Sequence, residues 1–185
     1  MFSDTIERAL EVCLCAHAGQ VRRGSPETPY SIHPISLALL ACQLGESDVV
    51  IQAALLHDVV EDCDGWDPAR MATEFGAEVA DIVAELTEDK TKTWDERKQA
   101  GIDKIPGLSE PAVRVKSLDK LHNLSRLADQ LEQASDRPAV WGLFTGGRER
   151  TLRMSRRLVE QLVKRARPEV AAALGAALAR VEAAA

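Results

Sequence analysis

Apolar residues recur at helical spacing along most of the chain, and glycines and prolines separate the helical stretches. The clearest case is 110–133, where one face of a long predicted helix carries Val115, Leu118, Leu121, Leu124, Leu127, Ala128 and Leu131. We find no segment whose alternation of apolar and polar residues is typical of a strand. The pattern therefore predicts an all-α fold.

The remaining predicted helices are shorter, and their ends are set by capping residues and breakers. They cover 4–18, Tyr30 to near Gly45, 48–62, 68–75, 77–87, weakly 97–105, and two segments split near Pro168. We expect 19–29 to be a loop, 88–96 to be a loop or a frayed helix start, and 141–147 to be a break.

One predicted helix ends in an unusual density of polar groups. The apolar run Ala53–Leu56 leads into His57, Asp58, Glu61 and Asp62. On a continuous helix, His57 and Glu61 would lie one turn apart, as would Asp58 and Asp62. Buried imidazoles and carboxylates are costly unless they are paired or bound to a metal. This stretch therefore predicts a functional site.

Candidate metal ligands occur in three separate segments, at His33, at His57 with Asp58, and at Asp119. Alone, each has an ordinary explanation: a helix cap, a surface pair, or a partner of a nearby charged side chain. Together, two imidazoles and two carboxylates suit Mn²⁺, with Fe²⁺ or Mg²⁺ as alternatives. Such a set also leaves coordination positions open for catalysis.

Acidic and basic residues near these ligands predict phosphoryl chemistry. Glu61 and Asp62 are candidates to take a proton from an attacking water. Cations beside a metal ligand fit a substrate with several phosphates. The candidates for substrate binding are the loop residues Arg22 and Arg23, the helix residues Lys116, Lys120 and Asn123, and Arg148 in the basic C-terminal segment.

Composition narrows the classes of function. A chain of 185 residues with 45% hydrophobic content predicts a single domain over residues 1–185. The net charge of −6 argues against a nucleic-acid partner. The apolar runs are too short to span a membrane, and Met1–Asp4 lacks a signal-peptide layout, so a cytoplasmic location is expected. Cys13, Cys15, Cys42 and Cys63 are expected to be small core residues. The oligomeric state stays open.

The joint pattern resembles the HD superfamily of metal-dependent phosphohydrolases, and most closely the hydrolase domain of RelA/SpoT homologues, including stand-alone small alarmone hydrolases. The resemblance runs from about residue 10 to 130. It rests on Gly19–Arg23, Pro29–Pro34, Ala53–Asp62, Phe75–Gly76, Leu86–Lys90 and Val115–Leu124. It implies a helical bundle around a metal, normally Mn²⁺, held by His33, His57, Asp58 and Asp119.

The same resemblance implies roles for the other candidates. Glu61 and Asp62 match the catalytic acidic pair, Arg22 and Arg23 match a basic loop near the substrate phosphates, and Asn123 matches a contact to the nucleoside. The implied activity is removal of pyrophosphate from the 3′ position of (p)ppGpp- or (p)ppApp-type alarmones of the stringent response. The helices of 148–185 match poorly, so the preferred base stays open.

Two other functions share these residues. The first is a broader nucleotide phosphatase of the HD type, such as one acting on the 2′-phosphate of NADPH. The second is a catalytically silent module that binds an alarmone. The Glu61–Asp62 pair argues against the silent module, because a sensor has no need of a base beside a metal.

Overall fold

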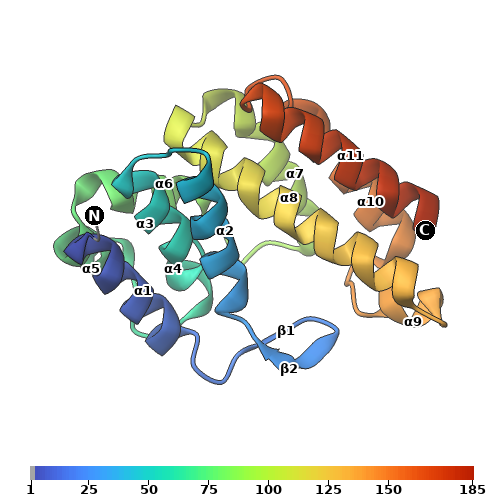
Figure 1. Cartoon of the computed structure of the whole chain (residues 1–185), viewed down its shortest axis with the longest axis horizontal. Helices are drawn as coiled ribbons and strands as arrows, with labels where there is room; N and C mark the ends of the chain where they lie inside the picture. The colour runs from blue at the N-terminus through green and yellow to red at the C-terminus, as the bar shows by residue number, and fades with distance from the viewer. Residues whose placement is uncertain (1–2) are drawn as a thin grey trace. The chain divides into compact units, whose positions relative to one another are not determined.

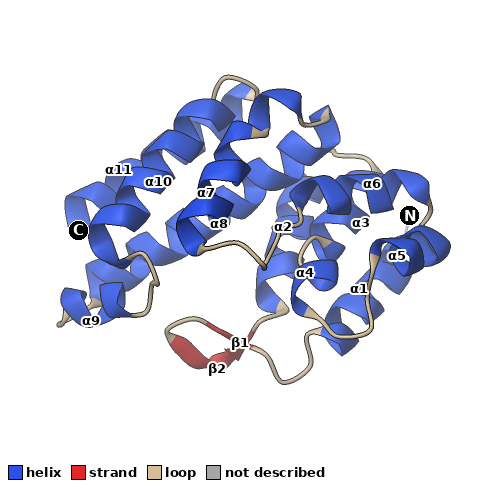
Figure 2. Ribbon diagram, turned by 180° about the vertical axis from the view of Figure 1, so that it is seen from behind, coloured by secondary structure: helices blue, strands red, loops and turns tan. Residues whose placement is uncertain are grey.

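The structure is a computed structural model that describes residues 3–185. Met1 and Phe2, part of the N-terminal stretch predicted to lack a leader, lie outside the described residues. Helices form nearly all of the regular structure, as Figures 1 and 2 show, and the all-α class is confirmed. No helix within 3–185 is both long and apolar enough to cross a membrane.

The chain divides into two compact units, of which the first comprises the chain up to Glu88 together with Ser109–Leu118. Its helices are α1 (Asp4–Ala16), α2 (Ile32–Gln43), α3 (Asp48–Leu56), α4 (Val59–Asp62), α5 (Pro68–Phe75), α6 (Ala77–Leu86) and the start of α8 (Glu110–Gln133). Helix α3 packs against α1, α2 and α6, and every residue from Val50 to Leu56 is buried. This central helix leads directly into His57.

The second unit comprises Asp89–Leu108 and Asp119–Ala185. It contains α7 (Trp94–Asp103), the short 3₁₀ helix η1 (Ile105–Gly107), the rest of α8, α9 (Arg137–Gly142), α10 (Gly147–Leu162) and α11 (Pro168–Ala184). Helix α10 contacts α7, α9, α11 and η1. The predicted pair of C-terminal helices split near Pro168 is confirmed, and α8 spans the predicted 110–133.

Capping residues explain where several helices begin. The side chains of Ser47 and Asp67 accept hydrogen bonds from backbone N–H groups in the first turns of α3 and α5. Of the two expectations for 88–96, a helix start applies at the end of the stretch, because Thr93 and Glu96 form a capping box and α7 begins at Trp94. The Asp136 side chain caps α9 by accepting a hydrogen bond from the Ala139 N–H, and Trp141 is helical rather than in a break.

The loop predicted at 19–29 contains a short antiparallel hairpin, formed by β1 (Val21–Arg22) and β2 (Ser25–Pro29). The expectation of no strand was therefore wrong here. Gly24 has a φ of 74°, which allows the tight turn between two very short strands. The hairpin is closed at its root by a hydrogen bond from the Tyr30 N–H to the Gln20 carbonyl, 2.9 Å long.

The helix predicted over 48–62 is interrupted at His57 and Asp58. Helix α3 ends at Leu56 and α4 begins at Val59. The Asp62 N–H bonds to the Asp58 carbonyl at 2.8 Å, so Asp58 starts the new turn. His57 and Asp58 consequently point from a helix junction rather than from one continuous face.

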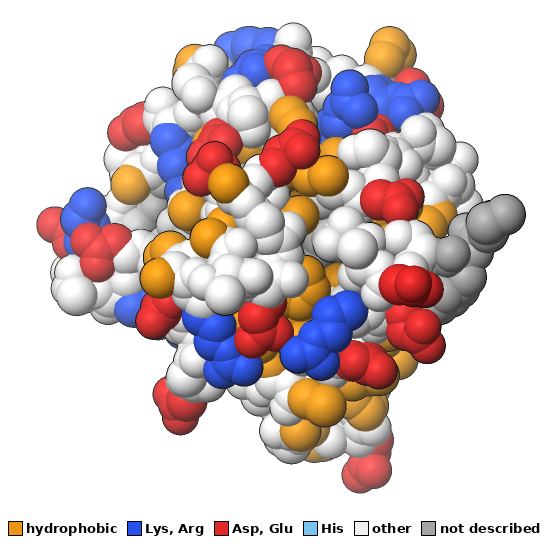
Figure 3. Space-filling view, turned by 90° about the vertical axis from the view of Figure 1, so that its left-hand side faces the viewer, with side chains coloured by type: hydrophobic (Ala, Val, Ile, Leu, Met, Phe, Trp, Pro, Cys, Tyr) orange, Lys and Arg blue, Asp and Glu red, His pale blue; other side chains and the backbone are white. Residues whose placement is uncertain are grey.

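Burial corrects the expectation that all four cysteines are small core residues. Cys13 is buried, and this burial raises the pKa of its thiol to about 12. Cys15 and Cys42 are exposed and Cys63 is half-buried, so the expectation of four core cysteines was wrong for three of them. The surface in Figure 3 intersperses acidic and basic side chains, with hydrophobic ones between them.

Candidate functional site

Three of the predicted metal ligands converge in the first unit. His33 lies in the first turn of α2, while His57 and Asp58 form the junction between α3 and α4. Their ligand atoms all lie within 4.8 Å of one another. Asp58 Oδ2 is 2.9 Å from His57 Nε2 and 4.0 Å from His33 Nε2. Ligands about 2.1 Å from one ion lie roughly 3–4 Å apart, which matches these separations.

Hydrogen bonding fixes which nitrogen of His57 can bind a metal. Its Nδ1 lies 2.9 Å from the Ala54 carbonyl oxygen, which only accepts, so Nδ1 carries the proton. In the neutral imidazole, Nε2 then presents a lone pair toward an Asp58 oxygen. Two lone pairs facing each other at 2.9 Å repel unless a proton or a metal ion lies between them. This donor set therefore fits a divalent cation.

Tyr30 links the hairpin to this cluster. Its hydroxyl donates a hydrogen bond to Asp58 Oδ2. The Arg22 guanidinium lies over its ring, 5.4 Å from the centroid. Arg22, a predicted phosphate-binding residue, is thus one side chain away from the Asp58 carboxylate, while Arg23 is exposed at the hairpin turn.

Glu61 lies one turn beyond Asp58 and is partly buried. Burial raises the pKa of its carboxyl group, and the nearby Glu88, Asp58 and Asp62 carboxylates act in the same direction. Its Oε2 accepts a hydrogen bond of 2.9 Å from the Glu88 N–H, which opposes that rise. The Asp62 side chain is exposed. Glu61 therefore has the surroundings of a general base, and Asp62 does not share them.

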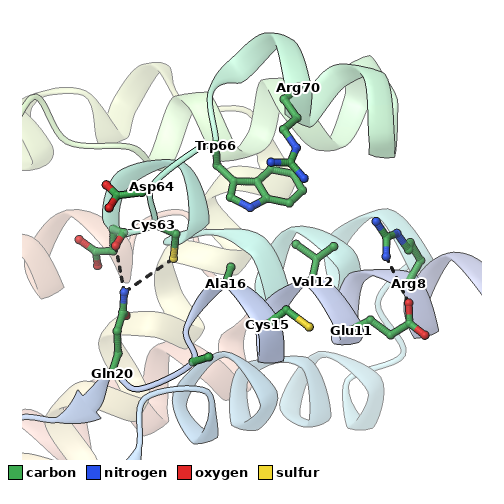
Figure 4. Close-up of a pocket in the computed structure, with 12 residues that line it drawn as sticks. Arg8, Glu11, Val12, Cys15, Ala16, Gln20, Cys63, Asp64, Trp66 and Arg70 are labelled. Carbon is green, nitrogen blue, oxygen red and sulfur yellow. Dashed lines mark hydrogen bonds and ion pairs between the residues drawn. The ribbon is translucent and has the colours of Figure 1, made fainter.

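Gln20 contacts the other end of α4. Its amide Nε2 donates to the Asp62 carbonyl at 3.0 Å. The same nitrogen lies 3.8 Å from Cys63 Sγ (Figure 4). Its Oε1 is 2.8 Å from Nδ1 of His17, which is only 2% exposed. Gln20 therefore connects the buried His17 to the end of α4.

A groove of about 520 Å³ lies beside Gln20, along α1 and α5 (Figure 4). Its wall includes Trp66, whose ring carries the Arg70 guanidinium 4.0 Å from its centroid. Asp62 and Cys63 line one end of it. None of His33, His57 and Asp58 lines this groove, so it is a separate feature from the metal-ligand cluster.

The remaining predicted site residues lie mostly in the second unit. Asp119 accepts a hydrogen bond of 2.5 Å from Asn123 Nδ2, one turn along α8. Lys120 donates to the buried Ser155 hydroxyl at 2.8 Å. Arg148 is exposed in the first turn of α10. Lys116 belongs to the first unit and is half-buried. The roles of these residues stay predictions.

Comparison with known proteins shows which family the chain belongs to. The model of the HD domain family matches residues 9–144. The chain belongs to the HD domain family. The matched stretch begins in α1 and includes every predicted metal ligand and both predicted catalytic carboxylates. Membership of this family implies a divalent metal ion, in agreement with the three converging ligands.

Individual relatives and solved structures show which members of the family this chain resembles. Guanosine-3′,5′-bis(diphosphate) 3′-pyrophosphohydrolase MESH1 of Homo sapiens is 46% identical over 111 residues, covering 58% of this chain and 62% of that protein. A solved structure described as a metazoan ortholog of SpoT that hydrolyzes ppGpp has a TM-score of 0.83, 27% identity and 97% coverage of both chains. The structure of lmo0812 from Listeria monocytogenes EGD-e has a TM-score of 0.70 and 29% identity, covering 81% of this chain and 96% of that one. The resemblance to RelA/SpoT homologues is confirmed.

The sequence pattern did not assign a role to Tyr30 or Gln20, although both lie in motif segments. Tyr30 is the only tyrosine of the chain and stands three residues before His33. That position was a usable signal, because a phenol beside a metal ligand commonly has a hydrogen-bonding role. Gln20 gave no such signal, since its contacts with α4 and Cys63 are to residues 42 and 43 positions away.

Proposed function

We propose that this chain is a metal-dependent 3′-pyrophosphohydrolase that acts on ppGpp-type alarmones and releases pyrophosphate and a 5′-phosphorylated nucleotide. The observation that carries the proposal is the convergence of His33, His57 and Asp58 ahead of Glu61. The chain spans about 62% of the length of a curated relative that is named for this reaction. Adenosine alarmones of the (p)ppApp type are the alternative substrates.

The proposed ligands are His33, His57 and Asp58, with Asp119 as the fourth on the evidence of its sequence motif. An N/O donor set of this kind suits Mn²⁺, with Fe²⁺ or Mg²⁺ as alternatives. A divalent ion held by these residues would supply Lewis-acid activation of water and stabilisation of negative charge on the phosphoryl oxygens. The carbonyl of Ala54 holds the His57 ring in the tautomer that binding requires.

Glu61 is the proposed general base, assisted by Asp62. The Glu88 N–H holds Glu61 Oε2, which leaves Oε1 to accept the proton of the attacking water. The water oxygen bonds to the phosphorus attached to O3′, the P–O3′ bond breaks, and O3′ takes up a proton as pyrophosphate leaves. Proton transfer of this kind contributes about 10²- to 10⁴-fold. Most of the remaining acceleration would be electrostatic, and the basic residues would contribute to it by stabilising negative charge on the phosphoryl oxygens.

The proposed phosphate contacts are Arg22, Arg23, Lys116, Lys120 and Arg148, and Asn123 is the proposed contact to the nucleoside. Arg22 has the strongest structural support, because Tyr30 connects it to Asp58. One guanidinium group can bind two oxygens of a phosphate at once, which suits a substrate with two diphosphate groups.

A substrate panel with Mn²⁺, before and after chelation, tests the proposal. The panel contains ppGpp, ppApp, NADPH and a deoxynucleoside triphosphate, and released phosphate and pyrophosphate are measured separately. We expect pyrophosphate from an alarmone, and no turnover after chelation. Inorganic phosphate from NADPH would favour the broader phosphatase, and binding without turnover would favour the silent module.

A further inference from the structure

Tyr30 occupies the junction between the hairpin and α2. Its N–H bonds to the Gln20 carbonyl at 2.9 Å, which closes the hairpin root. Its own carbonyl accepts the His33 N–H at 2.9 Å, in the first turn of α2. The backbone of Tyr30 is therefore held on the hairpin side and on the side of a proposed metal ligand.

The ring of Tyr30 is held between two histidines. Its centroid lies 4.8 Å from that of His17 and 5.8 Å from that of His33. Aromatic rings at these separations attract each other and restrict side-chain rotation. The position of the hydroxyl is consequently fixed before any ligand binds.

That hydroxyl donates to the Asp58 oxygen that faces both histidine nitrogens. A carboxylate without such a donor rotates broadly about its terminal bond. A hydrogen bond from a neighbouring group holds one orientation and so prepares the ligand for its ion.

The ring of Tyr30 also supports Arg22. The guanidinium carbon lies 5.4 Å from the ring centroid, within the range of a cation–π contact. A half-buried arginine held against an aromatic face loses less freedom when it binds a phosphate. One side chain thus contacts a proposed metal ligand and a proposed phosphate-binding residue.

We infer that Tyr30 is a positioning residue that orients Asp58 for the metal through its hydroxyl and Arg22 for the substrate through its ring. The proposed effect on Arg22 rests on the proposed function, whereas the proposed effect on Asp58 concerns metal binding alone. The two effects can be separated by mutation, because Tyr30→Phe removes only the hydroxyl and Tyr30→Leu also removes the aromatic face.

Titration of the substrate-free protein with Mn²⁺, followed by calorimetry, tests the hydroxyl. Tyr30→Phe is expected to weaken Mn²⁺ binding about 10- to 100-fold. At saturating Mn²⁺, its KM is expected to stay within about twofold of wild type, since the ring is kept. Thr28→Val is the matched control, because it removes the 2.7 Å hydroxyl contact between Ser25 and Thr28 in the same hairpin. It is expected to bind Mn²⁺ like wild type.

A double-mutant cycle tests the ring. Arg22→Ala is expected to raise KM in wild type and in Tyr30→Phe, but to have little further effect in Tyr30→Leu. Wild-type Mn²⁺ affinity in Tyr30→Phe overturns the role of the hydroxyl. If Arg22→Ala raises KM as much in Tyr30→Leu as in wild type, the role of the ring is overturned. If Tyr30→Leu does not fold, the comparison uses Tyr30→Phe, which keeps the ring. A KM increase in Tyr30→Phe as large as that caused by Arg22→Ala then overturns the role of the ring. If wild type binds Mn²⁺ but hydrolyses no alarmone, the proposed function fails while the Mn²⁺ titration still decides the hydroxyl.

Discussion

At the scale of single residues, Glu61 combines a partly buried carboxylate with a proposed role as base. Burial raises the pKa of its carboxyl group in the folded protein. The folded state therefore binds more protons than the unfolded state between the ordinary glutamate pKa of about 4.3 and the raised value. Stability falls as the pH rises through this window, and the penalty persists above it. The ionised Glu61 carboxylate therefore lowers the free energy of unfolding at the pH values at which it could act as a base.

Glu61→Gln should separate these two effects. A glutamine oxygen still accepts the Glu88 N–H, but the buried charge is gone. In chelated protein at neutral pH, we expect a Tm at least equal to that of wild type, and a smaller difference at acid pH. In Mn²⁺-loaded protein, we expect most turnover to be lost.

Thermal melts across pH and steady-state rates provide the measurements for Glu61→Gln. Glu160→Gln is the control, since Glu160 is exposed and lies 3.9 Å from its partner Lys164. It should change neither quantity. Near-normal turnover of Glu61→Gln would remove this residue from the chemistry.

At the scale of elements, an ion pair with a buried carboxylate joins the α2–α3 connection to α8. Arg114 Nη1 lies 2.5 Å from Glu46 Oε2, and the Glu46 side chain is only 1% exposed against 43% for Arg114. Arg114→Leu leaves a buried carboxylate without this donor and is expected to cost about 1.5–3 kcal/mol. Urea unfolding measures it. Arg126→Leu, which breaks the exposed pair with Asp129, is expected to cost under about 1 kcal/mol. Equal effects would contradict this assignment.

The connection between α9 and α10 packs against α7 at Gly146. A Cβ there would lie 2.6 Å from Trp94 Cη2 and 2.8 Å from Thr151 Oγ1. Arg150 closes the same corner through Asp95, at 2.6 Å, and through the Thr145 carbonyl, at 2.9 Å. A methyl group at Gly146 therefore forces the indole or the chain turn to move.

Gly146→Ala is expected to destabilise the protein by about 1–3 kcal/mol. Gly175→Ala is the matched control, because Gly175 lies exposed within α11 and an added Cβ there meets nothing within 4 Å. Alanine should stabilise that helix by about 0.5–1 kcal/mol. Chemical denaturation measures the free energy of unfolding of both variants. An unchanged value for Gly146→Ala would contradict the prediction and show that Trp94 and Thr151 can move to accept the methyl group.

At the scale of the whole molecule, metal binding should appear as stability. A ligand that binds only the folded state at 100 times its Kd adds about 2.7 kcal/mol. We expect Mn²⁺ to raise the Tm of wild type, and His57→Ala to abolish the rise. Asp119→Ala is expected to reduce it, which tests the ligand predicted from its motif. Differential scanning fluorimetry with and without chelator measures all three proteins. A full Mn²⁺ shift in His57→Ala would contradict its assignment as a ligand.

Much of the helical architecture followed from the sequence, because helix periodicity is local. The stripe from Val115 to Leu131 predicted α8 over the residues that form it. Helix breakers and capping residues within a few positions of each end likewise predicted the bounds of α5. The hairpin escaped because its two strands are too short to show alternation.

The sequence alone determined the all-α class, the order of the helices, the family, and the identity of the candidate ligands, since each depends on residue type and spacing. Only the tertiary structure decided the break between Leu56 and Val59, which separates His57 and Asp58 from both helices. Only the tertiary structure also decided which atoms meet, such as the Tyr30 hydroxyl and a carboxylate 28 positions away. Such contacts depend on how distant helices pack, and local pattern carries no record of that packing.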